Sequence, residues 1–283
     1  MSFQIYAFAD EASPKLDGQL AALQRNGLAG PELRNVDGEN VSDLSAEKAK
    51  ALHRRLEDAG LRVWSLGSPI GKVTLDADFD AHMEKLRRTM ETGQILGAEN
   101  VRIFSFYLPE TEAPEQYGAE VIDRLGKMTE LAGAFGMTLC HENEKGIYGS
   151  TPERCTELLT AIPALQGVFD PANFVQCGVE VWPAWLLLRE RIKYLHIKDA
   201  LADGTVVPAG RGIGAIKEIL ADYSFRGGEV LTLEPHLAVF SGLGALEREN
   251  EQSRIDGTRY KTEDEAFDSA VHALNDLIKE LEK

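Results

Sequence analysis

The sequence has little of what marks exported or membrane-bound proteins. No apolar run approaches the roughly 18 uncharged residues that suggest a membrane-spanning helix. The N-terminal stretch MSFQIYAFADEAS carries no basic region and reaches an acid at Asp10 before any long apolar run, unlike a secretory signal. We therefore expect a cytoplasmic protein that has no membrane partner.

Cysteine is also scarce, with residues at positions 140, 155 and 177 only. Their number is odd, and their spacing is too wide for a CxxC zinc or redox motif. Cys140, Cys155 and Cys177 are therefore expected to be free thiols, buried in a protein from a reducing compartment.

Positive charge is in deficit. The chain has 30 Lys and Arg against 46 Asp and Glu, which gives a formal net charge of −16 at pH 7. Such a field repels phosphate backbones, so nucleic acid is not an expected partner, and a small neutral substrate or a cation fits better. Hydrophobic residues make up 43% of the chain, enough to bury a large core without disulfides.

Short β-branched or aromatic runs alternate with longer amphipathic stretches, the pattern of βα units in a parallel sheet. Eight such runs begin at Phe3, Leu28, Leu61, Asn100, Met137, Gly167, Ile192 and Glu229. Their spacing averages about 30 residues, one strand plus its crossover helix. Eight units predict an α/β protein with a single (β/α)₈ barrel, or TIM barrel, as one domain over residues 1–283.

One stretch departs from this repeat. Residues 237–262 have mixed charge and glycine and do not continue the βα pattern. Long irregular connections are commonly functional or mobile. The sequence leaves three roles open for this stretch: a lid, a contact in a homo-oligomer, or a mobile loop.

Polar residues cluster where four consecutive predicted strands end, in the motifs HENE at 141–144, DPAN at 170–173, HIKD at 196–199 and EPH at 234–236. At the carboxyl end of a barrel strand, polar side chains point into the mouth where reactions occur. Three carboxylates there would repel one another unless a cation lay between them. We therefore predict a divalent metal held by Glu142, Asp170, His196 and Glu234.

Three oxygen ligands and one imidazole, with no thiolate, suit Mn²⁺, Mg²⁺ or Co²⁺, with Zn²⁺ as a further alternative. One divalent ion, Mn²⁺ first among these, is the predicted cofactor. A strand-end acid taken alone is more often a helix cap or an ion-pair partner, so the prediction depends on the coincidence of all four residues. Three other histidines, His53, His82 and His272, lie in helical stretches and are expected at the surface.

At these strand ends the chain resembles the sugar phosphate isomerase/epimerase family, the xylose isomerase-like barrels that include ketose 3-epimerases and inosose-processing enzymes. The resemblance runs from FADEAS to the last helix and includes the glycine-containing turn VPAGRGIG. It implies that Glu142 and Glu234 lie on opposite faces of a keto sugar, where one removes a proton and the other returns it. Asp170 and His196 would hold the metal without transferring protons.

The physical argument for this chemistry is independent of the resemblance. A metal that polarises a carbonyl and its neighbouring hydroxyl stabilises the enediolate that forms when the C–H proton leaves. A carboxylate within reach then suffices as the base.

The residues expected to grip the substrate differ from those of ketose 3-epimerases. Those enzymes place a histidine three residues after the strand-six Asp, where this chain has Asn173. They also place an arginine in the loop after strand seven, where this chain has Lys198 and, further on, Arg211. Lys198 either neutralises an enolate oxygen or a substrate carboxylate, or forms a salt bridge to Asp199 or Glu234.

The complete set of predicted substrate contacts adds residues near the ends of the second, third and eighth strands. The set is Glu32, Ser68, Asn173, Lys198, Arg211 and His236. No glycine-rich phosphate loop with adjacent basic residues is visible, which favours a non-phosphorylated substrate.

Four functions stay open. The first is a metal-dependent isomerase or epimerase acting on a sugar, keto sugar or cyclitol, and the second is a lyase or dehydratase acting on a keto sugar, keto-glycoside or inosose. A phosphodiesterase like the barrel-shaped DNA-repair endonucleases would need more histidines at the mouth and a basic surface. A non-catalytic sugar-binding protein is the fourth, because a fold alone does not establish activity.

Overall fold

The computed structural model describes residues 2–109, 113–245 and 254–283 of the chain. Its main sheet is built from short strands, each of which overlaps one of the eight predicted runs. These strands are β1 Gln4–Ala7, β2 Gly30–Pro31, β5 Ser65–Gly67, β6 Asn100–Ile103, β7 Thr138–Glu142, β8 Gln166–Phe169, β9 Ile192–Ile197 and β12 Val230–Leu233. Two small antiparallel ladders lie outside it: β3 Asn35–Val36 with β4 Glu39–Asn40, and β10 Asp199–Ala200 with β11 Val206–Val207.

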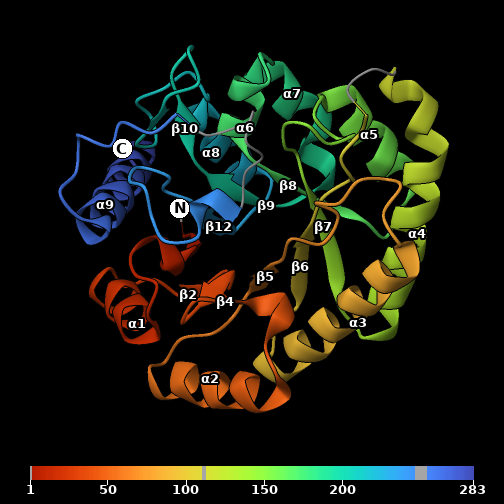
Figure 1. Cartoon of the computed structure of the whole chain (residues 1–283). Coiled ribbons are helices and arrows are strands. Elements are labelled where there is room, and N and C mark those ends of the chain that lie inside the picture. Colours follow the sequence, from red (N-terminus) through yellow and green to blue (C-terminus); the bar gives the residue numbers. More distant parts are fainter. Residues whose placement is uncertain (1, 110–112, 246–253) are drawn as a thin grey trace.

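The strands of the main sheet pair in parallel, in the order β2-β1-β12-β9-β8-β7-β6-β5. Its two edges meet just beyond β2, where the Leu33 amide donates to the Ser65 carbonyl at 3.0 Å and the Gly67 amide donates to the Leu33 carbonyl at 2.8 Å. The sheet therefore closes on itself, with the helices arranged around it (Figure 1). The predicted α/β barrel is confirmed.

The helices that cover the barrel are α1 Leu16–Arg25, α2 Ala46–Asp58, α3 Phe79–Leu96, α4 Gly118–Ala134, α5 Pro152–Ala161, α6 Pro171–Gln176, α7 Val181–Leu188, α8 Ile216–Phe225 and α9 Glu263–Leu281. Short 3₁₀ turns are η1 Ala9–Glu11, η2 Val41–Asp43, η3 Pro114–Tyr117, η4 Arg189–Arg191 and η5 Leu243–Ala245. In the part of the chain that the structure describes, no helix is both long and apolar enough to cross a bilayer.

Local chemistry explains where these helices begin and end. At α3, the Asp78 carboxylate accepts from the Ala81 amide at 3.0 Å, and Gly97 ends the helix with φ +71°. At α5, the Thr151 hydroxyl caps the first turn, and Pro152 occupies a position whose amide has no partner within the helix. These caps set the helix boundaries, while the parallel pairing of the strands brings their carboxyl ends to one mouth.

The loop after β10 is organised by a single carboxylate. Asp199 accepts hydrogen bonds from the amides of Gly210, Gly212 and Gly214, each at 2.9 Å. A Cβ at Gly212 would lie 2.3 Å from Asp199 Oδ1 and 2.2 Å from the Ala200 carbonyl oxygen. A Cβ at Gly214 would lie 2.6 Å from the same Oδ1, so glycine at these two positions is required by the close approach of the backbone to Asp199.

The segment 237–262, for which three roles were open, is described in part: residues 246–253 lie outside the described residues. Its beginning packs onto the mouth, because Leu237 and Phe240 are buried. The Phe240 ring lies 5.5 Å from the His236 ring and 5.1 Å from the Arg34 guanidinium. This part of the segment shields the mouth from solvent, and the choice among the three roles stays a prediction.

The prediction that the three cysteines are free, buried thiols is confirmed in part. All three cysteines are free, with Cys140 and Cys155 buried and Cys177 half-buried.

The prediction that His82 lies at the surface is wrong, because the side chain is 7% exposed and its Nε2 accepts from the Gly71 amide at 3.0 Å. Burial of the ring, with the nearby charges of Lys85 and Arg124, lowers the pKa of His82 to about 4.

This buried histidine should make stability depend on pH. An unfolded histidine has a pKa of about 6.5, so the unfolded chain binds a proton between about pH 6.5 and 4 that the folded chain excludes. Neutral His82 therefore contributes fully to the free energy of unfolding above this pH window, and this contribution is lost as the pH falls through the window. The slope of unfolding free energy against pH should therefore be lower in His82→Gln by up to roughly 1.4 kcal/mol per pH unit.

Urea denaturation across this window measures the slope for the wild type and His82→Gln. His272→Gln, which removes an exposed histidine, serves as the control and should keep the wild-type slope. Equal slopes for the wild type and His82→Gln would contradict the prediction.

Candidate metal centre

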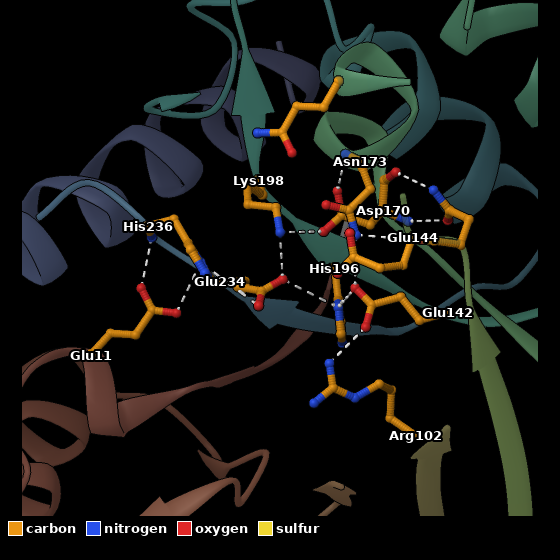
Figure 2. Close-up of polar contacts among 12 residues, drawn as sticks. Glu11, Arg102, Glu142, Glu144, Asp170, Asn173, His196, Lys198, Glu234 and His236 are labelled. Carbon is orange, nitrogen blue, oxygen red and sulfur yellow. Dashed lines mark hydrogen bonds and ion pairs between the residues drawn. The ribbon is translucent and has the colours of Figure 1, made fainter. Parts of the chain in front are cut away.

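Four ionisable side chains from four neighbouring strands converge at the carboxyl-end mouth of the barrel. Glu142 is the last residue of β7, Asp170 follows β8, His196 lies in β9 and Glu234 follows β12. One donor atom from each lies within 4.8 Å of the others, and all four residues are buried (Figure 2). The structure thus brings together the four residues that the sequence predicts as ligands.

Asp170 presents one carboxylate oxygen to this group. Its Oδ1 accepts from the Asn173 amide at 2.8 Å and so caps α6. Its backbone is held by the Asn143 side chain, which bonds both its amide and its carbonyl at 2.9 Å. Oδ2 is fully buried without a hydrogen-bond partner, and the Lys198 ammonium forms an ion pair with it at 3.1 Å. A buried carboxylate oxygen in this state is a ready ligand for a cation.

The His196 ring is held between two acidic groups. Nδ1 lies 2.9 Å from Glu142 Oε1 and 3.6 Å from Glu234 Oε2, while Nε2 lies 3.2 Å from Glu32 Oε2. Glu32 in turn accepts from the Tyr194 hydroxyl at 2.8 Å. A proton on Nε2, shared with Glu32, would leave the Nδ1 lone pair directed at the cluster, as metal-binding histidines require.

The charges of the cluster oppose one another strongly. Burial raises the pKa of Glu142, but the charges of His196 and Arg102 outweigh burial and lower it to about 2. Arg102 Nη1 lies 2.7 Å from Glu142 Oε2. Burial and the neighbouring carboxylates raise the pKa of Asp170 to about 7 despite Lys198. Glu142 is therefore held in its ionised form by its basic neighbours, whereas Asp170 is the carboxylate that burial makes hardest to ionise.

Burial alone would lower the pKa of His196, yet the charges of Glu142 and Glu32 raise it well above the ordinary value. The imidazole thus retains a proton in response to the acids around it. A divalent cation would replace that proton, because a metal ligand must be neutral imidazole.

A second group shares Glu234 but already contains its cation. Glu11, Glu234 and His236 also offer donor atoms within 4.8 Å of one another. Arg34 contacts Glu11 Oε1 at 3.0 Å and Glu234 Oε1 at 3.2 Å, and it also binds Asp10. This guanidinium supplies the charge that a metal would bring, so the group is an ion-pair network.

Three predicted substrate contacts lie at the cluster. Asn173 Nδ2 lies 3.3 Å from Glu142 Oε1, and Lys198 Nζ lies 2.9 Å from Glu234 Oε2. His236 Nδ1 lies 3.2 Å from Glu11 and 3.7 Å from Glu234. Lys198 thus forms the salt bridge to Glu234, which was one of the two interpretations of this residue. Asp199, the other possible partner, accepts from the glycine turn instead.

The other three predicted contacts have different surroundings. Glu32 lies behind His196, with one oxygen on Nε2 and the other on Tyr194. The Ser68 hydroxyl donates to the Arg102 carbonyl at 2.6 Å and so is used by the backbone. Arg211 is exposed and lines a surface pocket beside α9. Strand-end position does not specify which way a side chain turns, and the roles of these three residues as substrate contacts stay predictions.

Sequence reasoning did not assign roles to Asp10, Glu11 and Arg102. The acids lie in η1, shortly after β1, and directly follow the predicted run that begins at Phe3, so the rule that selected the other strand ends would have found them. Arg102 lies inside β6 and is 5% exposed, and a basic residue within a barrel strand is itself a signal of a buried carboxylate partner. Arg102 and Arg34 hold Glu142 and Glu234 in place, so both belong to the site.

Fold and cluster together define an α/β barrel with a buried carboxylate and imidazole cluster at its carboxyl-end mouth that could hold a metal ion. A family profile described as xylose isomerase-like TIM barrel matches residues 20–248, and the chain belongs to that family. No curated protein matches the chain.

Three similar solved structures share the fold at low identity. The IolI protein with a bound zinc atom is 16% identical, with 99% of each chain covered and a TM-score of 0.75. A probable 3-DHS dehydratase, AsbF, from Bacillus anthracis is 17% identical, with 97% of this chain and 99% of that chain covered and a TM-score of 0.73. An L-ribulose 3-epimerase is 18% identical, with 100% and 96% covered and a TM-score of 0.72.

The contact between Glu32 and His196 leads to a prediction about metal affinity. Glu32→Gln removes the charge behind Nε2, so His196 should become a weaker ligand, and Mn²⁺ affinity should fall by roughly tenfold to a hundredfold. Tyr194→Phe removes the hydroxyl on Glu32 but leaves the imidazole contact, so its effect should be smaller.

Isothermal titration of both variants and the wild type with Mn²⁺ measures these affinities. Unchanged affinity in Glu32→Gln would show that this carboxylate does not support His196 as a ligand.

Proposed function

We propose that this protein is a divalent-metal-dependent isomerase or epimerase that acts on a sugar, keto sugar or cyclitol by removing a proton beside a carbonyl. The observation that carries the proposal is the convergence of Glu142, Asp170, His196 and Glu234, with Asp170 Oδ2 buried and free of hydrogen bonds. Membership of the xylose isomerase-like family supports it, as does the similarity to an L-ribulose 3-epimerase.

The donor set fits one divalent ion. Three carboxylates and one imidazole are hard or borderline ligands, which suit Mn²⁺ first and then Mg²⁺, Co²⁺ or Zn²⁺. The IolI protein that shares this fold was solved with zinc, which is compatible with the same donor types. A bound divalent ion would supply polarisation of the substrate carbonyl and stabilisation of the negative charge that develops on it.

Glu142 and Glu234 are matched in a way that suits them to exchange a proton with the substrate. Each has one oxygen paired with a buried arginine, Arg102 at 2.7 Å and Arg34 at 3.2 Å, and its other oxygen turned toward His196 Nδ1. The arginines orient the carboxylates and favour their ionised form. One carboxylate would take the proton from carbon and the other would return it, giving epimerisation, or isomerisation when the proton returns to the neighbouring carbon.

A lyase or dehydratase is the second candidate, because it begins with the same proton abstraction. The departing hydroxyl group needs a proton donor, and the Lys198 ammonium lies 2.9 Å from Glu234 Oε2. A probable 3-DHS dehydratase is among the proteins that share the fold. Loss of water from the substrate, in addition to hydrogen exchange, would favour this candidate.

The first experiment measures metal content and hydrogen exchange together. Purified protein stripped of metal should bind one equivalent of Mn²⁺, because one set of four donors converges at the mouth. The loaded protein is then incubated in deuterated water with a panel of non-phosphorylated keto sugars and inososes, and exchange is followed by NMR. Deuterium incorporated beside the carbonyl supports the proposal, whereas the absence of metal binding would remove its basis.

The two proposed proton-transfer residues should be essential. Glu142→Gln and Glu234→Gln should each lower turnover of the exchanging compound by roughly a hundredfold to ten-thousandfold, because an amide cannot accept the proton. Glu144→Gln is the matched control, since Glu144 lies two residues after the end of β7 but pairs with Lys72 at 3.2 Å, outside the donor set.

Circular dichroism checks that each of these variants keeps the barrel. Wild-type turnover in Glu142→Gln and Glu234→Gln would contradict the assignment of proton transfer to these two residues.

A further inference from the structure

We infer that Lys198 is a tethered cation that competes with the divalent metal for the carboxylates of Asp170 and Glu234. Metal affinity is then set partly by the displacement of this lysine. The inference rests on the proposed metal-dependent function, and it assigns to a residue of this chain a role in regulating that same site.

The backbone directs Lys198 into the cluster. It directly follows β9 and lies two residues after His196, so the alternation of side chains, continued one residue beyond the strand, turns both toward the mouth. The lysine is 6% exposed, and its Nζ lies 2.9 Å from Glu234 Oε2 and 3.1 Å from Asp170 Oδ2 (Figure 2). The ammonium thus bridges two of the four candidate ligands.

The oxygens that Lys198 contacts are those left for a metal. Asp170 Oδ1 is used by the Asn173 amide, so Oδ2 is the oxygen that remains for a cation. Glu234 Oε1 faces Arg34 at 3.2 Å, and its Oε2 is the oxygen that faces His196 Nδ1 at 3.6 Å. Lys198 therefore holds the cluster side of both carboxylates.

The buried arginines differ from Lys198 in this respect. Arg102 binds Glu142 Oε2, and Arg34 binds Glu234 Oε1, while the other oxygen of each carboxylate faces His196. These guanidiniums can stay in place when a metal binds. Among the basic side chains in contact with the four candidate ligands in the described residues, the lysine is the one placed to compete.

Charge repulsion between the two cations, and the flexibility of the lysine side chain, explain how Lys198 and the metal would compete. An ammonium and a divalent ion that share the same two oxygens would lie a few ångströms apart in a site with little water, where like charges repel strongly. A lysine has a flexible four-carbon stem and can move its charge away. Before it is displaced, Lys198 partly neutralises the carboxylates and so stabilises the metal-free protein.

The test compares Mn²⁺ affinity in the wild type and in Lys198→Met, which keeps an unbranched apolar stem without the charge. The dissociation constant, measured by electron paramagnetic resonance of free Mn²⁺, should be at least tenfold lower in the variant. Lys72→Met is the matched control: it also removes a positive charge near the mouth, but Lys72 pairs with Glu144 outside the donor set. Its affinity should stay near that of the wild type.

A second variant and a second readout guard against misfolding. Lys198→Gln keeps a hydrogen-bond donor for the carboxylates while it removes the charge, and it should also bind Mn²⁺ more tightly. The rise in melting temperature caused by saturating Mn²⁺ should be larger in both Lys198 variants than in the wild type, because their metal-free forms lack the internal cation.

The outcomes separate this inference from the proposed function. Tighter binding in the Lys198 variants, with Lys72→Met unchanged, supports the competition. Equal or weaker binding, or an equal gain in Lys72→Met, overturns it while wild-type Mn²⁺ binding still supports the metal-dependent function. No binding in any of the proteins overturns both.

Discussion

Repulsion among carboxylates buried at one end of the barrel is the constraint on which the rest of the structure depends. Glu142, Asp170 and Glu234 lie within reach of one another, and each would be costly to ionise alone. The chain answers with basic side chains from other strands, Arg102 and Lys198 among them. Because every pair joins different strands, the neutralisation of charge also holds the strand ends in register. These ion pairs therefore organise the site and also link the ends of neighbouring strands.

The ion pairs at the mouth also support the shortest part of the sheet. β2 has two residues, and the barrel closes there through the backbone of Leu33. Arg34, the next residue, reaches Glu11 after β1 and Glu234 after β12, so one guanidinium spans the ends of three strands. The ring of Phe240 covers this guanidinium and keeps water from it. Closure of the barrel and organisation of the mouth are thus produced by the same contacts.

The sequence predicts those parts of the molecule that depend on local pattern. Each of the eight strands was predicted because short β-branched or aromatic runs recur at the length of a βα unit. Glu142, Asp170, His196 and Glu234 were found because polar residues end four strands in succession. Contacts that depend on rotamers and on distant elements were not predicted. Glu32 was expected to face the substrate but lies behind His196, and no local pattern distinguishes these two directions. His82 was placed at the surface because it lies in a helical stretch, yet it faces the Gly71 amide.

The glycine turn held by Asp199 contains positions that tolerate little substitution next to positions that are free to vary. Substitutions at Gly212 and Gly214 would force atoms into contact with that carboxylate, so the backbone of the turn has little tolerance for mutation. Arg211 and Ile213 alternate with these glycines and are exposed. New side chains at these two positions would alter the rim of the barrel without disturbing its scaffold. Evolution can therefore diversify this edge of the molecule while the carboxylate beneath it preserves the shape of the turn.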